Sequence, residues 1–156
     1  MDAELLNEIR GREWFYRFEL PDGSTTASYL PEAARSVHET RLMMVREKLD
    51  PLLASGPMTA LDLGSHQGWF SVELAKMGCS RVTGVEPRAT HVHDARLMTR
   101  ALGLESRLEF VHSSIDELPG IGIEPADIVL MLGLIYHLEN PVGAIRTAHA
   151  HCRKVC

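Results

Sequence analysis

Carboxylates and glycines at two neighbouring points of the chain are the residues best suited to chemistry. Asp62 lies at the end of a short apolar segment, and Gly64 and Gly68 flank the loop that follows. Glu86 ends the next apolar segment. A glycine loop after one strand and a carboxylate after the next hold a ribose-bearing cofactor in doubly wound sheets. Either feature alone also fits a plain junction between strand and helix, but together they favour a cofactor site.

The charge of Asp62 indicates which cofactor the loop suits. A carboxylate there would repel a pyrophosphate and attract an ammonium or sulfonium group. A dinucleotide loop also needs glycine at its second position, where this chain has His66. We therefore favour S-adenosylmethionine over NAD or FAD. Asp62 would hold its amino group, directly or through a water, and Glu86 would accept hydrogen bonds from both ribose hydroxyls. Gly64 would let the cofactor approach the backbone, and Gly68 would let the next helix pack closely.

The elements that must position these residues alternate along the chain. We predict strands at 59–63, 81–86, 108–112 and 127–132, and helices at 68–77, 89–102 and 141–151. Alternating strands and helices predict an α/β fold, a doubly wound and mostly parallel sheet, over a cofactor domain at residues 58–156. Residues 154–156 read as the start of a fifth strand. We therefore expect a sheet truncated after its fourth strand and the following helix.

The first part of the chain, residues 1–57, lacks this alternation. It contains a short amphipathic segment, an aromatic run at 14–18 and a helical pattern at 32–48, which Pro51 ends or kinks. We interpret it as a helical and aromatic extension that forms a cap or lid. The aromatic run either packs into the core or covers the sulfonium, with Trp14 or Tyr16 facing the cation.

Residues 59–153 resemble the cofactor half of the class I S-adenosylmethionine-dependent methyltransferases. The first motif of that family maps onto Asp62, Gly64, Ser65 and Gly68. His66 departs from it, because the family most often has glycine at that place. The family's acidic residue after the second strand corresponds to Glu86, which Pro87 follows.

Two later segments extend the resemblance. The adenine-contacting segment after the third strand maps to Ser114 and Ile115, with Asp116 beside them. The motif after the fourth strand maps to residues 131–141, where Gly-Leu-Ile-Tyr-His-Leu-x-x-Pro is similar to a subgroup that includes enzymes modifying the wobble uridine of tRNA. The resemblance implies a Rossmann-like methyltransferase, and it adds to the cofactor site His66, Trp69, Pro87, Leu132, Gly133 and Leu134.

Tyr136 and His137 are the candidate catalytic residues. They follow the fourth predicted strand, at the carboxyl edge where ligands bind in such sheets. His137 could remove a proton from an acceptor hydroxyl or amine, or it could only cap the loop and orient Tyr136. A base is not obligatory, because methyl transfer mainly requires that donor and acceptor be aligned.

Composition and charge disfavour several classes of binding partner. The chain has 156 residues and a net charge of −5, which argues against a large nucleic-acid surface. The apolar run at 128–136 is too short to span a bilayer, and the first residues lack a basic segment followed by an apolar one, so we expect no membrane contact and a cytoplasmic location. Cys152 and Cys156 lie near two histidines, so a metal site is one interpretation of this segment. We favour the other interpretation, in which a helix ends here and a strand begins.

Three functions therefore stand as hypotheses. The leading one is methyl transfer to a small-molecule acceptor. The second is modification of tRNA with a carboxylated form of the cofactor, which would need a cation such as Arg88 or Arg96 and a basic face. The third is a non-catalytic cofactor-binding module, or half of a split enzyme, in which a homodimer or an additional chain covers the open sheet edge.

Overall fold

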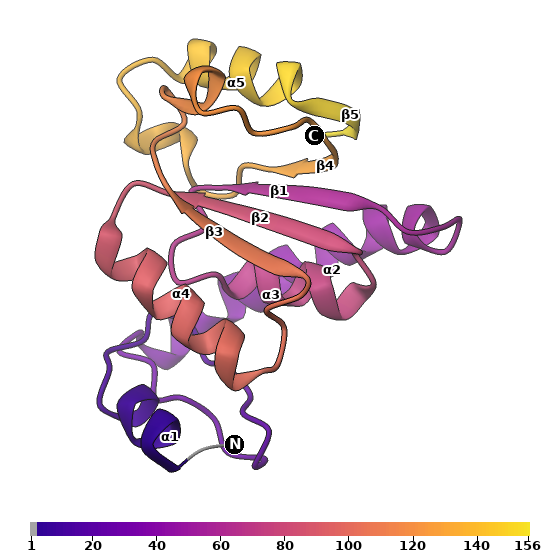
Figure 1. Ribbon diagram of the computed structural model, residues 1–156. Helices are drawn as coiled ribbons and strands as arrows, with labels where there is room; N and C mark the ends of the chain where they lie inside the picture. The colour runs from indigo at the N-terminus through magenta and orange to yellow at the C-terminus, as the bar shows by residue number, and fades with distance from the viewer. Residues whose placement is uncertain (1–2) are drawn as a thin grey trace.

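The computed structural model describes residues 3–156, which form a five-stranded sheet between layers of helices (Figure 1). The strands run in the order β3-β2-β1-β4-β5, and each pair is parallel. They are β1 (Thr59–Leu63), β2 (Arg81–Glu86), β3 (Leu108–His112), β4 (Ala126–Leu130) and β5 (Cys152–Val155). The α/β class, the parallel sheet and the first three strand ranges predicted from the sequence are confirmed.

The two faces of the sheet are covered by different helices. Alternate residues of β1 point to opposite faces, so Ala60 joins one core cluster while Leu61 and Leu63 join the other. The first face carries α2 (Glu32–Leu53), α3 (Trp69–Met77) and α4 (Ala89–Ala101), and the second carries α5 (Pro141–Ala150) (Figure 1). Burial on both faces explains why β4 is a nearly continuous apolar run in the sequence.

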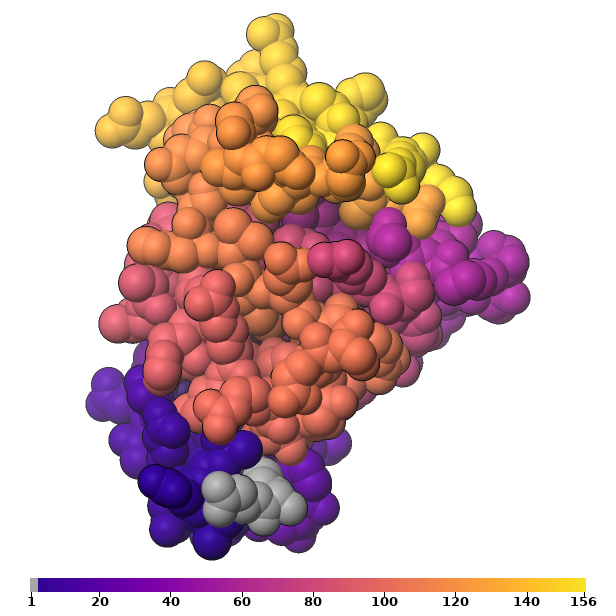
Figure 2. Space-filling model, viewed as in Figure 1, coloured from indigo at the N-terminus to yellow at the C-terminus, as the bar shows by residue number. Residues whose placement is uncertain are grey.

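The N-terminal segment packs against the first of these layers. Helix α1 (Ala3–Arg10) contacts α4, and α2 contacts α3. Trp14 and Phe18 are buried in the core, and the indole Nε1 of Trp14 donates a 2.8 Å hydrogen bond to the carbonyl of Ile9. In the space-filling view the N-terminal segment lies at one end of the molecule, and the C-terminal residues lie at the other (Figure 2). The core interpretation of the aromatic run therefore holds for Trp14 and Phe18.

Three boundaries differ from the sequence prediction by two residues or more. Strand β4 ends at Leu130, two residues early, because Gly133 takes a left-handed φ of 72° and the chain turns into the short 3-10 helix η2 (Ile135–His137). Helix α2 continues through Pro51 to Leu53, since a proline in the last turn removes only one hydrogen bond. Strand β5 begins at Cys152, so it pairs with β4 and covers the edge that the sequence left open.

The other short elements agree closely with the sequence. A 3-10 turn, η1 (Leu118–Gly120), lies in the acidic connection after β3. Gly68 precedes α3 as its N-cap, and Leu102 follows α4 as its C-cap. Among residues 3–156, no helix is long and apolar enough to cross a membrane. Metal-ligating side chains are not clustered in the same range: no group of three or more histidine, cysteine, aspartate or glutamate side chains is arranged to hold a metal.

Candidate functional site

A cavity of about 440 Å³ opens where β1, β2 and β4 end. The strand order reverses direction between β1 and β4, and parallel sheets bind ligands outside the carboxyl ends of their strands at such a point. Nine of the residues predicted from the sequence line this cavity. They are Gly64, His66, Glu86, Pro87, Leu132, Gly133, Leu134, Tyr136 and His137.

The loop after β1 keeps the shape of a glycine loop although it contains histidine. His66 has a φ of 52°, in the left-handed region that non-glycine residues rarely occupy. Gly64 has a φ of 73°, and a Cβ there would lie 3.1 Å from Leu134 Cδ1. The backbone amides of Gly64 and Ser65 both donate to the carbonyl of Val85, at 2.8 and 3.1 Å. A strained residue held in place by its surroundings is typical of binding sites.

Glu86 is a buried carboxylate on the wall of the cavity. It is 2% exposed, and its Oε2 accepts a 3.0 Å hydrogen bond from the backbone amide of His66. Its Oε1 accepts from the backbone amide of Arg88 at 3.1 Å and from the Arg88 Nε at 3.0 Å. The Arg88 side chain is 61% exposed, so it can turn toward solvent and free one acceptor position of Oε1, which keeps its hydrogen bond from the Arg88 backbone amide. Glu86 can therefore accept hydrogen bonds from a diol in the cavity.

Asp62 lies behind the cavity wall rather than on it. Its carboxylate accepts a 2.7 Å hydrogen bond from the Ser71 hydroxyl, on α3. Burial raises the pKa of Asp62 to about 6, against the opposing effect of the Ser71 hydrogen bond. Burial is also the main cause that raises the pKa of the Tyr16 phenol, and the negative charge of Asp62 adds to it. Asp62 thus acts on this region through its electric field.

A pair of closely packed histidine rings, tilted by 36°, borders Glu86. The rings of His66 and His91 lie 3.9 Å apart, and the His91 Nδ1 is 3.5 Å from Glu86 Oε1. Burial, with the nearby His91 and Arg88, lowers the pKa of His66 to about 3. The ring is therefore neutral at physiological pH. Within residues 3–156, no group bonds the buried Nδ1 of His66, which leaves a polar atom free at the site.

Two of the other predicted cofactor residues serve the packing of the loop. Ser65 is buried, and Gly68 sits where a Cβ would lie 2.6 Å from Phe110 Cζ. Trp69 stacks on Tyr16, with ring centroids 5.4 Å apart and planes 7° apart. Both rings line a second cavity of about 590 Å³ between the N-terminal segment, α2 and α3.

The predicted adenine-contacting segment lies outside the first cavity. Ile115 is buried in the core cluster of the α5 face. Ser114 donates from both its backbone amide and its hydroxyl to the Glu117 carboxylate, at 2.9 and 3.1 Å. Asp116 is exposed in the same turn. The contact of this segment with adenine stays a prediction.

Five lining residues were not among the predicted site residues: Phe15, Tyr16, Arg41, Arg88 and Leu138. The aromatic run indicates Tyr16 as part of a lid, and the tRNA hypothesis names Arg88 as a cation for a carboxylated form of the cofactor. Arg41 carries no local signal, because α2 reaches the cavity through tertiary packing, which includes its contact with α3. A Cβ at Gly133 would lie 3.5 Å from the Arg41 Nη1 and 3.2 Å from the Tyr136 hydroxyl. The Arg41 guanidinium and the Tyr136 hydroxyl therefore both lie close to the backbone of Gly133.

Comparison with known proteins identifies the family. The family described as "Methyltransferase domain" matches residues 60–155, which are more than half of the chain. The chain belongs to the class I S-adenosylmethionine-dependent methyltransferases. The cofactor of the family is therefore S-adenosylmethionine, as the sequence predicted.

Individual relatives are distant. A tRNA U34 carboxymethyltransferase from Desulfotalea psychrophila is 28% identical over 85 residues, which are 54% of this chain and 26% of that protein. A ubiquinone biosynthesis O-methyltransferase from Ruegeria pomeroyi is 28% identical over 89 residues, 57% of this chain and 34% of that protein. The chain thus matches about a quarter to a third of the length of these relatives.

A solved structure shares the fold over almost the whole chain. It is the N-terminal domain of EvdMO1 with S-adenosylhomocysteine bound, with a TM-score of 0.73 and 20% identity. The likeness covers 99% of this chain and 63% of that one. It therefore includes the N-terminal segment and α2, which lie outside the family match, and at this identity it supports the fold alone.

Proposed function

We propose that this chain binds S-adenosylmethionine in the 440 Å³ cavity and catalyses methyl transfer to a small-molecule acceptor. The observation that carries the proposal is the buried Glu86 carboxylate, fixed by the His66 amide at the switch point of a parallel sheet. Ligand sites of this kind commonly enclose about 300–1,000 Å³. The volume, the diol acceptor and the close backbone at Gly64 all fit a nucleoside.

Each wall of the cavity has a distinct role in the proposed reaction. The bound cofactor supplies a methyl group already activated on a sulfonium. Glu86 accepts from the ribose hydroxyls once Arg88 has turned away, and the charged acceptor strengthens those bonds. Tyr136 and His137 border the same cavity, and their rings lie 4.3 Å apart. His137 takes the proton that the acceptor oxygen or nitrogen loses as it gains the methyl group.

Calorimetric titration with S-adenosylhomocysteine tests the cofactor site. Glu86→Gln keeps the size of the side chain but removes its charge, and we expect binding about tenfold weaker, which corresponds to about 1.4 kcal/mol. Glu109→Gln is the matched control, because Glu109 is an exposed carboxylate on β3 away from the cavity. A folded wild-type chain that binds NAD but not S-adenosylhomocysteine would overturn the proposal.

A second function is favoured by the cations of the cavity. Arg41 and Arg88 both line it, and either could pair with the additional carboxylate of a carboxylated cofactor. The similarity to tRNA U34 carboxymethyltransferases points the same way, whereas the net charge of −5 opposes an extended RNA surface. Binding of tRNA that weakens steeply with salt, together with preference for the carboxylated cofactor, would favour this function over the first.

Cofactor binding without turnover would indicate the third hypothesis. The test is methyl transfer from labelled cofactor to candidate small molecules and to tRNA, by the chain alone and then with a longer form of it. Transfer by the chain alone would exclude a non-catalytic module. Tight cofactor binding with transfer only in the longer form would support a split or incomplete acceptor site.

A further inference from the structure

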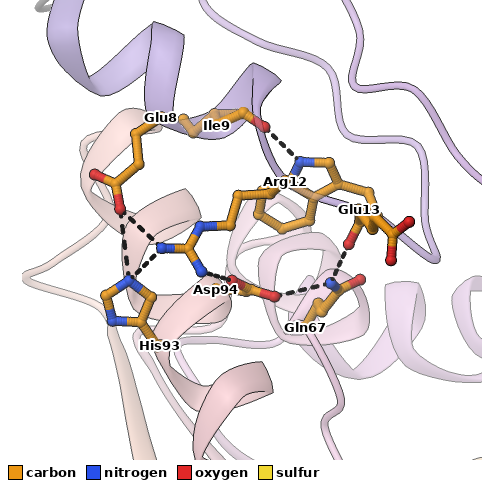
Figure 3. A network of polar contacts seen from close by, with 8 residues as sticks. Glu8, Ile9, Arg12, Glu13, Gln67, His93 and Asp94 are labelled. Carbon is orange, nitrogen blue, oxygen red and sulfur yellow. Dashed lines mark hydrogen bonds and ion pairs between the residues drawn. The ribbon is translucent and has the colours of Figure 1, made fainter.

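A buried polar network ties the N-terminal segment to the cofactor loop (Figure 3). Its centre is Gln67, which lies between His66 and Gly68 and is 3% exposed. The Gln67 amide group donates to the carbonyl of Glu13 at 2.9 Å and to Asp94 Oδ2 at 3.0 Å. Its oxygen accepts from the backbone amide of Phe15 at 2.8 Å. Both ends of one side chain thus hold the segment at 13–15.

Asp94 fixes the orientation of the Gln67 amide. Its carboxylate is 7% exposed, and its second oxygen accepts a 3.0 Å hydrogen bond from Arg12. Arg12 also contacts Glu8 at 2.9 Å and the His93 Nε2 at 2.9 Å. A buried carboxylate needs such partners, because an unpaired one is costly to desolvate. The network therefore spans α1, α4 and the loop after β1.

The network sets the position of one wall of the cofactor cavity. The Phe15 ring lies 5.0 Å from the His66 ring, and both line the cavity. The next residue, Tyr16, also lines it and stacks on Trp69. Gln67 itself is absent from the lining, so it reaches the cavity only through the backbone of Phe15 and its own neighbour His66.

We propose that Gln67 and Asp94 are positioning residues, which hold the aromatic pair Phe15 and Tyr16 over the cofactor. The affinity of the protein for the cofactor then depends on contacts outside the cavity. This inference rests on the proposed cofactor site. Without the network the aromatic pair would lose its link to the cofactor loop. It would then be held only from its own segment, by the buried Trp14 and Phe18 and by the 2.6 Å hydrogen bond from the Ser28 hydroxyl to the Phe15 carbonyl, and it would be more mobile at the cavity wall. The entropy lost when the pair becomes ordered would then oppose binding of the cofactor.

Titration with S-adenosylhomocysteine and denaturant unfolding of the same variants test the inference. Gln67→Glu replaces the donor with a second carboxylate facing Asp94, and we expect binding about tenfold weaker. Gln67→Glu combined with Asp94→Asn restores one amide–carboxylate hydrogen bond with its polarity reversed but not the bond to the Glu13 carbonyl, and we expect the affinity to return in part. Arg10→Gln is the control, since it breaks an exposed ion pair with Asp22 in the same segment.

The two measurements separate positioning from simple stabilisation. If Gln67→Glu lowers the free energy of unfolding but leaves the affinity unchanged, the network is only a structural clamp and the inference is wrong. If Gln67→Glu does not fold, Arg12→Gln takes its place. It weakens the support of Asp94 from the surface, and we expect about threefold weaker binding. If the wild-type chain binds no S-adenosylhomocysteine, the proposed cofactor site itself fails.

Discussion

Replacement of Gly68 by alanine should destabilise the protein through two separable effects. The residue has a φ of 81°, which costs an L-residue about 1–2 kcal/mol. The new Cβ would also lie 2.6 Å from Phe110 Cζ and 3.1 Å from Ala95 Cβ. Overpacking of a well-packed core costs about 1–3 kcal/mol more. We therefore expect Gly68→Ala to lower the free energy of unfolding by about 3 kcal/mol, the approximate sum.

Gly78→Ala is a matched control for the backbone effect. Gly78 follows α3 with a φ of 112°, and nothing lies within 4 Å of the position of its Cβ. Only the conformational cost should remain, about 1–2 kcal/mol. Urea unfolding with unchanged m-values would measure both differences. In a Phe110→Leu background, the cost of Gly68→Ala should fall toward that of Gly78→Ala, because the ring atoms that it meets are gone.

Equal costs for the two alanine variants would refute this reasoning. They would mean that Phe110 moves aside freely and that Gly68 is needed only for its φ. The same variants report on function, because Gly68 begins α3 directly after the cofactor loop. A displaced loop should weaken binding of S-adenosylhomocysteine in Gly68→Ala but not in Gly78→Ala.

Three further predictions concern pH and capping. The pKa of Asp62 is raised from 3.8 to about 6, so its ionisation destabilises the folded state; wild-type stability should fall by about 2 kcal/mol relative to Asp62→Asn between pH 4 and pH 7, measured by urea unfolding at each pH. The pKa of His66 is lowered from 6.5 to about 3, so stability should be lost as pH falls from 6.5 toward 3; His66→Asn, which tolerates the left-handed backbone, should flatten this loss in thermal unfolding. Asn140 accepts a 2.9 Å hydrogen bond from the Gly143 amide at the start of α5, and Asn140→Ala should cost about 1 kcal/mol in denaturant unfolding while Asn140→Ser costs less.

The strands were predictable because their pattern is local. The ranges 59–63, 81–86 and 108–112 agree with the structure at both ends, since each is an apolar run bounded by polar or turn-forming residues. The end of β4 was not predictable from the sequence, because the apolar run continues to residue 136 while pairing with β1 stops at Leu130. Hydrogen-bonded pairing, and not hydrophobicity, decided where that strand ended.

The candidate site was likewise predictable from the sequence only in part. Gly64, His66 and Glu86 were identifiable because the chain order of a parallel sheet brings successive strand ends to one edge. Arg41 and Phe15 join them from the helical pattern at 32–48 and the aromatic run at 14–18, neither of which shows by itself that the segment reaches this cavity. The sequence also could not show that the Asp62 carboxylate is bonded to Ser71 and is not part of the cavity lining.

The amino-acid sequence by itself determined the α/β class, the family, the cofactor and the loop on which the site is built. These follow from short-range patterns, in which each residue type is matched to its neighbours in the chain. Only the tertiary structure decided how the N-terminal segment meets the loop, through Gln67, Asp94 and Arg12. Those residues are far apart in sequence, and a hydrogen bond between them depends on the packing of whole helices, which no local pattern encodes.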